Sequence, residues 1–195
     1  MKNLKIFIAA VMLLLSVSGV QAQSISDVLS GIGKTLVGSK ATTASSIKGT
    51  WKYKGPACEF ESSNMLAKAG GSAVSTKIEN KISPVISKFG VQGITYTFDG
   101  KGNYTSKIKT RAIKGTYTFD SKNKTITFKP TIGKAYTAYV TVQGSEMTLV
   151  FNANKLMSVL QSVSNSASAT NSTVSTINSL LKSYNGMRLG FRLKK

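Results

Sequence analysis

Glu59 and Glu61 form the one close pair of carboxylates in the sequence, and paired carboxylates are the groups that cleave glycosides. Side chains two residues apart on a strand share one face and lie ~6–7 Å from each other, within the ~5–10 Å that glycosidases use. The alternative is an edge strand that carries solvated charge. Because no second acidic motif accompanies the pair, we favour the solvated strand.

The sequence lacks the other residues and clusters that commonly carry catalysis. The 195 residues include no histidine, which removes the commonest general base, the commonest metal ligand and every triad that depends on histidine. The seven Asp and Glu residues are otherwise spread along the chain, unlike the ligands of a metal site. We therefore expect a non-enzymatic protein with no catalytic residue, no metal site and no cofactor.

Cys58 is the only cysteine, so the chain cannot form an intramolecular disulfide. It stands in a strand-like run, where a lone cysteine is more often a small buried apolar residue than a nucleophile. The fold must therefore rest on its apolar core.

Residues 1–22 have the pattern of a secretory signal peptide. Lys2 and Lys5 precede an apolar run from Ile6 to Leu15, and small or polar residues lead to a cleavage point after Ala22. The apolar run is about half of the ~20 residues that span a bilayer, which argues against a membrane anchor. We therefore expect an exported protein, periplasmic or extracellular, with no transmembrane segment after cleavage.

The chain is strongly basic. Without the signal peptide it carries 24 basic and 7 acidic residues, a net charge of +17. Such a charge attracts polyanions, including acidic glycans and lipopolysaccharide. The lysines alternate with threonines along predicted strands instead of forming a run, which favours general solubility over a dedicated site and predicts no specific nucleic-acid binding; they are Lys107, Lys109, Lys114, Lys124 and Lys129.

Helical spacing of apolar residues occurs in three segments. The first, residues 24–37, lies within an N-terminal amphipathic helix and linker over residues 23–46. The second, residues 62–89, is interrupted at Gly70-Gly71 and at Ser83-Pro84, which predicts two or three short helices with Pro84 in a first turn. The third covers residues 153–184, and both later segments are insertions in one domain over residues 47–195.

A strand-and-turn unit occurs twice in the sequence. Residues 95–101, TYTFDGK, recur as residues 116–122, TYTFDSK. Each copy is an alternating strand that runs into an Asp-led turn, and a further strand follows. The sequence therefore predicts a β-meander continued by a hairpin and a last strand; the predicted strands are 47–53, 95–98, 104–109, 116–119, 125–129, 135–142, 146–151 and 187–193.

Each predicted strand has one apolar face, and its other face is largely Thr and Lys. One-sided strands need a cover, either helices or closure of the sheet on itself. About eight strands is the number that closes into a small barrel whose interior is filled by side chains or holds one small ligand. We therefore predict a mainly β domain: an antiparallel β-barrel of about eight strands, with helices after strand 1 and before the last strand.

Gly49-Thr50-Trp51, at the opening of the first strand, resembles the Gly-x-Trp start of lipocalins and related fatty-acid-binding barrels. Together with Gly115-Thr116-Tyr117 and the ending Gly186–Phe191, it resembles a family of exported lipocalin-like proteins from Bacteroidetes, a domain of unknown function. The resemblance covers most of the mature chain and implies a lipocalin-like barrel outside the cytoplasm. In lipocalins the tryptophan lies across one end of the barrel under an arginine from the last strand. The resemblance therefore implies structural barrel closure by Trp51 with Arg188 or Arg192.

The aromatic-rich interior of such a barrel suits a small apolar or amphipathic ligand, and it suits a solid core equally well. We expect a pocket, where one exists, to be lined by Tyr96, Tyr104, Tyr117 and Phe119. The alternative is an envelope-associated interaction protein whose Lys/Thr face binds a polyanionic glycan, lipopolysaccharide or another protein.

Overall fold

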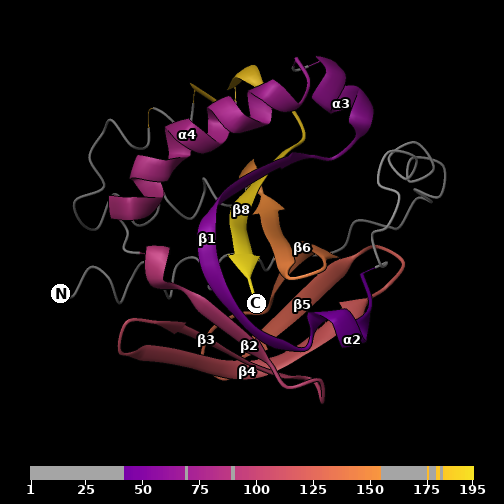
Figure 1. Ribbon diagram of the computed structural model, residues 1–195, viewed down its shortest axis with the longest axis vertical. Coiled ribbons are helices and arrows are strands. Elements are labelled where there is room, and N and C mark those ends of the chain that lie inside the picture. The colour runs from indigo at the N-terminus through magenta and orange to yellow at the C-terminus, as the bar shows by residue number, and fades with distance from the viewer. Residues whose placement is uncertain (1–41, 69, 89–90, 155–174, 176–178, 181) are drawn as a thin grey trace.

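The computed structural model describes residues 42–68, 70–88, 91–154, 175, 179–180 and 182–195 (Figure 1). The signal peptide predicted over residues 1–22 and the helix predicted over 24–37 lie outside these residues. The end of the predicted linker forms a short helix instead, α2 (Ala44–Ile47). The Thr43 hydroxyl starts this helix because it accepts a hydrogen bond from the Ser46 amide at 3.1 Å.

Eight antiparallel strands form one closed barrel (Figure 1). Each strand pairs with the next along the chain, and the last strand pairs with the first. The predicted mainly β fold of about eight strands is therefore confirmed. The strands are β1 (Gly49–Phe60), β2 (Thr95–Phe98), β3 (Asn103–Ile108), β4 (Arg111–Asp120), β5 (Thr125–Pro130), β6 (Tyr136–Gln143), β7 (Glu146–Asn152) and β8 (Met187–Lys194).

Strand β1 continues through Pro56 to Phe60, well beyond the strand predicted over residues 47–53. The Cys58 amide points away from β8, since it donates to the Glu79 carboxylate at 3.0 Å. Pro56 stands two residues earlier, so its nitrogen points the same way. The pairing between β1 and β2 has already ended at Lys52, and the missing N–H of Pro56 therefore costs no ladder hydrogen bond.

Helices α3 (Ser63–Lys68) and α4 (Ser72–Lys88) follow β1, as predicted. The expected break at Ser83-Pro84 does not occur, because α4 runs through Pro84. A proline inside a helix costs about 3 kcal/mol, and burial of Ile78 and Ile82 against Cys58 and its neighbours offsets this cost. The helix predicted before the last strand lies mostly outside the described residues.

The Asp-led turns of the repeat are confirmed. The carboxylate of Asp99 accepts hydrogen bonds from the amides of Lys101 at 2.6 Å and Asn103 at 2.9 Å. Asp120 does the same for the amides of Lys122 and Asn123 at 2.8 and 3.0 Å. Because these short bonds fix the turns, each repeat becomes a hairpin, β2 with β3 and β4 with β5.

The two ends of the barrel carry different covers (Figure 1). At the end where β1 begins, which we call the Trp51 end, Ile47 of α2 and Trp51 of β1 are completely buried. At the other end, which we call the α4 end, helix α4 and the 3₁₀ turn η1 (Val91–Gly93) stand where β1 finishes and β2 begins. Ile108 and Arg111, the last residue of β3 and the first of β4, also mark the α4 end.

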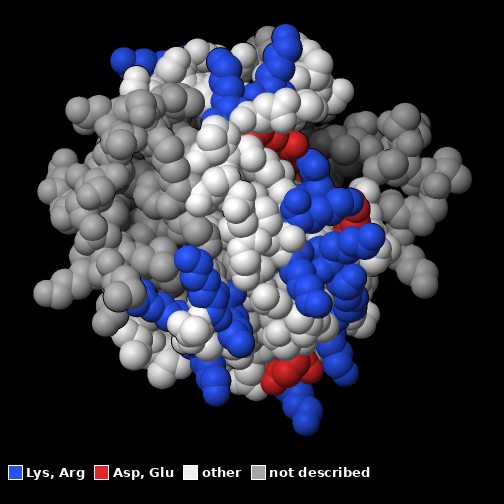
Figure 2. Space-filling view, turned by 60° about the vertical axis from the view of Figure 1, so that its left-hand side comes forward, with Lys and Arg blue, Asp and Glu red and all other residues white. Residues whose placement is uncertain are grey.

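The outer face of the barrel is polar. Thr50 and Thr97 exchange a hydrogen bond of 3.0 Å across β1 and β2, and Thr127 and Thr137 exchange one of 3.2 Å across β5 and β6. In Figure 2, blue Lys and Arg side chains are spread over the face in view, with few red Asp and Glu side chains among them. The apolar residues of the alternating pattern therefore face the barrel interior, and the Lys and Thr residues face outwards.

Gly190 of β8 tests this strand packing. A Cβ at Gly190 would lie 2.7 Å from the Val150 Cα of β7, whereas one at Gly55 would have nothing within 4 Å. We expect Gly190→Ala to lower the free energy of unfolding by about 1–3 kcal/mol, because the two strands must move apart. Gly55→Ala is the matched control and should change it little. Urea unfolding measures both, and equal stability of the two variants would contradict the packing described here.

Candidate ligand-binding site in the barrel

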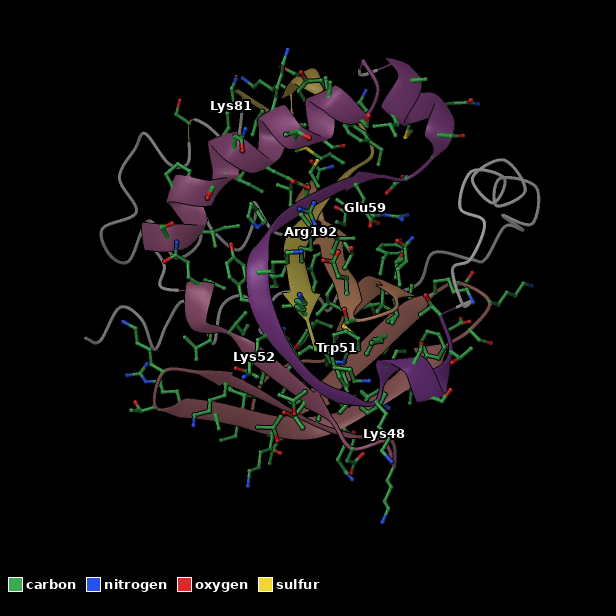
Figure 3. All side chains as sticks on the ribbon, viewed as in Figure 1. Lys48, Trp51, Lys52, Glu59, Lys81 and Arg192 are labelled. Carbon is green, nitrogen blue, oxygen red and sulfur yellow. The ribbon has the colours of Figure 1, made fainter. Side chains whose placement is uncertain are left out.

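Trp51 closes its end of the barrel from the first strand (Figure 3). Its indole Nε1–H donates to the carbonyl oxygen of Ile47 at 2.7 Å, so α2 satisfies the one polar atom of the buried ring. The cation over this ring is Lys195, whose Nζ lies 4.9 Å from the ring centroid. The arginine partner that the resemblance implied is therefore replaced by a lysine at the end of the chain.

Arg192 instead joins β8 to helix α4. Its guanidinium donates to both carboxylate oxygens of Glu79, at 2.9 and 3.1 Å. The same carboxylate accepts the Cys58 amide, so Glu79 connects the helix to β1 and β8 together. Burial, with the nearby Glu79 charge, raises the pKa of the Cys58 thiol to about 12, which keeps it neutral and unreactive.

Arg188 lies over a different ring, 3.3 Å from the ring centroid of Tyr139. Its strand partner is Glu59, directly opposite across β1 and β8 (Figure 3 labels Glu59 and Arg192). Burial raises the pKa of the Glu59 carboxyl, and the charges of Arg188 and Arg192 partly oppose that shift. Glu61 lies beyond the end of β1 and is exposed, so Glu59 and Glu61 do not form a pair on one strand face.

Aromatic rings pack against one another inside the barrel. Phe128 is completely buried at the centre, stacked on Tyr136 at 4.7 Å between ring centroids and edge-on to Tyr104 at 4.8 Å. Tyr96 and Phe98 pack against it at 6.0 Å each. Such pairs contribute about 0.5–1.5 kcal/mol each beyond their buried area, so this cluster is a rigid apolar wall.

Three tyrosine hydroxyls lie close together among these rings. The hydroxyl of Tyr136 is near those of Tyr96 and Tyr104, and Tyr96 is also near Ser106. Burial raises the pKa of all three tyrosines, so each keeps its proton at neutral pH. The hydroxyls of Tyr104 and Tyr136 nevertheless have no protein hydrogen-bond partner of proper geometry. A buried hydroxyl left in this way costs about 1–3 kcal/mol, so these two groups can bond a bound molecule.

The structure separates the four residues predicted to line a pocket. Tyr96 and Tyr104 lie side by side in the interior, each 2 % exposed. Tyr117 is buried nearer the Trp51 end, where its ring contacts Phe98 at 5.0 Å and its hydroxyl lies by the Gly100 backbone. Phe119 is only partly buried at the edge of the core. Tyr96 and Tyr104 thus belong to the candidate site, and the other two stand apart from the hydroxyl cluster.

Sequence reasoning missed Tyr136 and Arg111, and strand parity could have found both. Tyr136 has the parity of Val140 and Val142, which the alternation placed inside the barrel. Arg111 has the parity of the inward-facing Tyr117 on β4. A charged or polar residue at an inward position is the signal, because the interior of a small barrel excludes water.

A family of lipocalin-like domains, DUF4923, matches residues 19–195 of the chain. The chain belongs to this family. A solved DUF4847 family protein from Bacteroides vulgatus is 14 % identical, with a TM-score of 0.36, over 76 % of this chain and 92 % of that one. None of the curated proteins matches the chain.

The described part of this lipocalin-like domain contains neither a cluster of metal ligands nor a helix that could span a membrane. Within it, no three His, Cys, Asp or Glu side chains come together as metal ligands do. Its helices, as far as they are described, are too short or too polar to cross a membrane. The candidate site consists of the tyrosine hydroxyls and aromatic rings inside the barrel.

The Glu59 carboxyl makes the free energy of unfolding of this domain depend on pH. Because its pKa is raised in the folded protein, folding favours the protonated acid, and the stability this gives is lost as pH rises through the raised value. We expect Glu59→Gln to raise the melting temperature at pH 7 and to leave it unchanged well below pH 4.5, the ordinary pKa of glutamate. Glu61→Gln, at an exposed position, is the matched control. Thermal unfolding across this pH range decides, and a Glu59→Gln variant that is less stable than wild type at pH 7 contradicts the account.

Proposed function

We propose that this lipocalin-like domain is an exported, non-enzymatic protein that binds a small amphipathic ligand inside its barrel. The observation that carries the proposal is the pair of neighbouring buried hydroxyls on Tyr104 and Tyr136, which have no protein hydrogen-bond partner of proper geometry in a largely apolar interior. A pocket lined by apolar and aromatic side chains, with a few convergent polar groups, is the usual form of a small-molecule site.

The two ends of the barrel favour one location for this ligand. At the Trp51 end, Leu193, Met147 and Ile47 are fully buried, and Phe119 near the end of β4 is partly buried. Towards the α4 end, Tyr53, Ile86 and Ile113 pack against the core but stay partly exposed. A ligand that enters from the α4 end would cover these apolar side chains and reach the hydroxyl of Tyr136, the first residue of β6.

Export of the domain rests on the sequence of residues 1–22, with its basic start, apolar run and small residues before Ala22. We place the mature protein in the periplasm or outside the cell. The lack of histidine and of a catalytic pattern in the sequence supports binding as its role instead of catalysis.

Native mass spectrometry of the mature protein purified from its own host tests the proposal. We expect a bound small molecule that is lost on denaturation. Tyr136→Phe should carry at least tenfold less of this molecule, while its ligand-free form unfolds at the same or a higher temperature, because a buried hydroxyl without a partner is gone. Tyr139→Phe, on the outer face beneath Arg188, is the matched control. A ligand-free mass from the native host would count against the proposal.

A second candidate function is binding of a polyanion to the outer Lys/Thr face. Lys194 of β8 lies directly opposite Lys52 of β1, and the same row continues through Thr95 to Lys107 of β3. Like charges directly opposite on a sheet are destabilising, so this row favours an anion above it. Glu146 also lies opposite Lys194, but its carboxylate is paired with Lys54. Acidic glycans and lipopolysaccharide are the partners that this surface suits.

Heparin chromatography distinguishes binding through this row of lysines from retention by the net positive charge. We expect a triple Lys52→Gln, Lys107→Gln, Lys194→Gln variant to elute at clearly lower salt than a second triple variant of equal charge. The second variant carries the same change at three exposed lysines elsewhere, Lys77, Lys81 and Lys122. Elution of both variants at the same salt would show that net charge alone retains the protein.

A further inference from the structure

Arg111 is a charged residue at an inward position of the α4 end. It lies opposite Ile108 across β3 and β4, and Ile108 is buried on the inner face. Around the same rim, the Tyr53 amide donates to the Ile94 carbonyl at 3.0 Å, and Ile94 precedes the pair of Thr95 with Lys107. The inner row of this rim is therefore Tyr53, Ile94, Ile108 and Arg111, of which three are apolar or aromatic.

The guanidinium of Arg111 has an unsatisfied hydrogen-bond donor. Its Nη1 is buried and has no hydrogen-bond partner, and no ion pair of Arg111 occurs among the described residues. Arg192, on the outer face, shows the contrast because its guanidinium holds Glu79 through two bonds. A guanidinium that keeps its charge at all ordinary pH values needs an acceptor when one of its nitrogens leaves water.

We propose that Arg111 holds the acidic group of the ligand and that the ligand is an amphipathic monocarboxylic acid. The proposal rests on the proposed function and adds the ligand class and the residue that selects it. A planar guanidinium matches a carboxylate through two parallel hydrogen bonds. The apolar body of such an acid would lie against Ile113, two residues along the same strand, and reach towards Tyr53 across the rim; both side chains are partly buried against the core. A phosphate group suits the rim less well, because it uses several cationic donors and the inner row has a single one.

Isothermal titration of the full mature protein with three probes of one chain length tests the assignment. The probes are decanoate, decanol and decyl phosphate. We expect decanoate to bind wild type at least tenfold more tightly than decanol and more tightly than decyl phosphate. Arg111→Met should remove the advantage of decanoate over decanol and leave decanol binding unchanged.

Lys107→Met is the matched control, since it removes the same charge from the neighbouring strand but on the exposed outer face. It should keep the tenfold preference for decanoate. The ligand-free Arg111→Met protein should melt at or above the wild-type temperature, a result that a merely structural role of Arg111 would not give. Where Arg111→Met fails to fold, Arg111→Lys keeps the charge without the planar fork and should lower decanoate affinity selectively.

The outcomes separate this inference from the proposed function. Equal binding of decanoate and decanol, or a preference that survives in Arg111→Met, overturns the role of Arg111 while barrel binding stands. Tightest binding of decyl phosphate overturns the carboxylate assignment. Binding of none of the three probes overturns the amphipathic ligand itself, and the proposed function fails with it.

Discussion

Closure of an eight-stranded barrel removes most inward side chains from water. The interior of such a barrel is only wide enough for side chains or for one small molecule. Any polar atom on the inner face must therefore find its partner inside, and the cost of failing to do so is larger than the gain from an average hydrogen bond. The remaining features of the domain can be understood as ways of meeting this constraint.

The protein meets the constraint at the Trp51 end and at the contact between helix α4 and the barrel. The indole of Trp51 donates to Ile47, and Arg192 pairs with Glu79 so that helix α4 is fixed to β1 and β8. Where α4 runs alongside the last part of β1, Glu79 also satisfies the unpaired Cys58 amide. These contacts join the barrel and its helix into one packed unit.

In the interior and at the α4 end the constraint is not met by the protein alone. Tyr104, Tyr136 and Arg111 carry buried polar atoms on the inner face of β3, β6 and β4, and these atoms have no protein hydrogen-bond partner of proper geometry. Their arrangement has one charged group at the rim and two hydroxyls deeper among aromatic rings. A ligand that matches this arrangement has an acidic head, which binds Arg111 near the mouth, and an apolar body, which lies deeper in the barrel. This match is the basis for the ligand proposed here.

Strand alternation in the sequence was enough to predict the barrel, because period-two patterns assign each residue to an inner or an outer face. The repeat with its Asp-led turns predicted which strands pair. Local signals misjudged Pro56 and Pro84, since tertiary packing against α4 and the open edge of β1 decide whether a proline is tolerated. The partner of Trp51 was also beyond the sequence, because Lys195 reaches that ring only through the register of β1 and β8.

A high-resolution crystal structure of the protein purified from its own host tests the central claim most directly. The account predicts density for a bound organic molecule within hydrogen-bonding distance of the Tyr104 or Tyr136 hydroxyl, with its acidic group on Arg111. Hydroxyls bonded only to ordered water, with Arg111 turned out to solvent, would contradict the account and leave the barrel as a filled core.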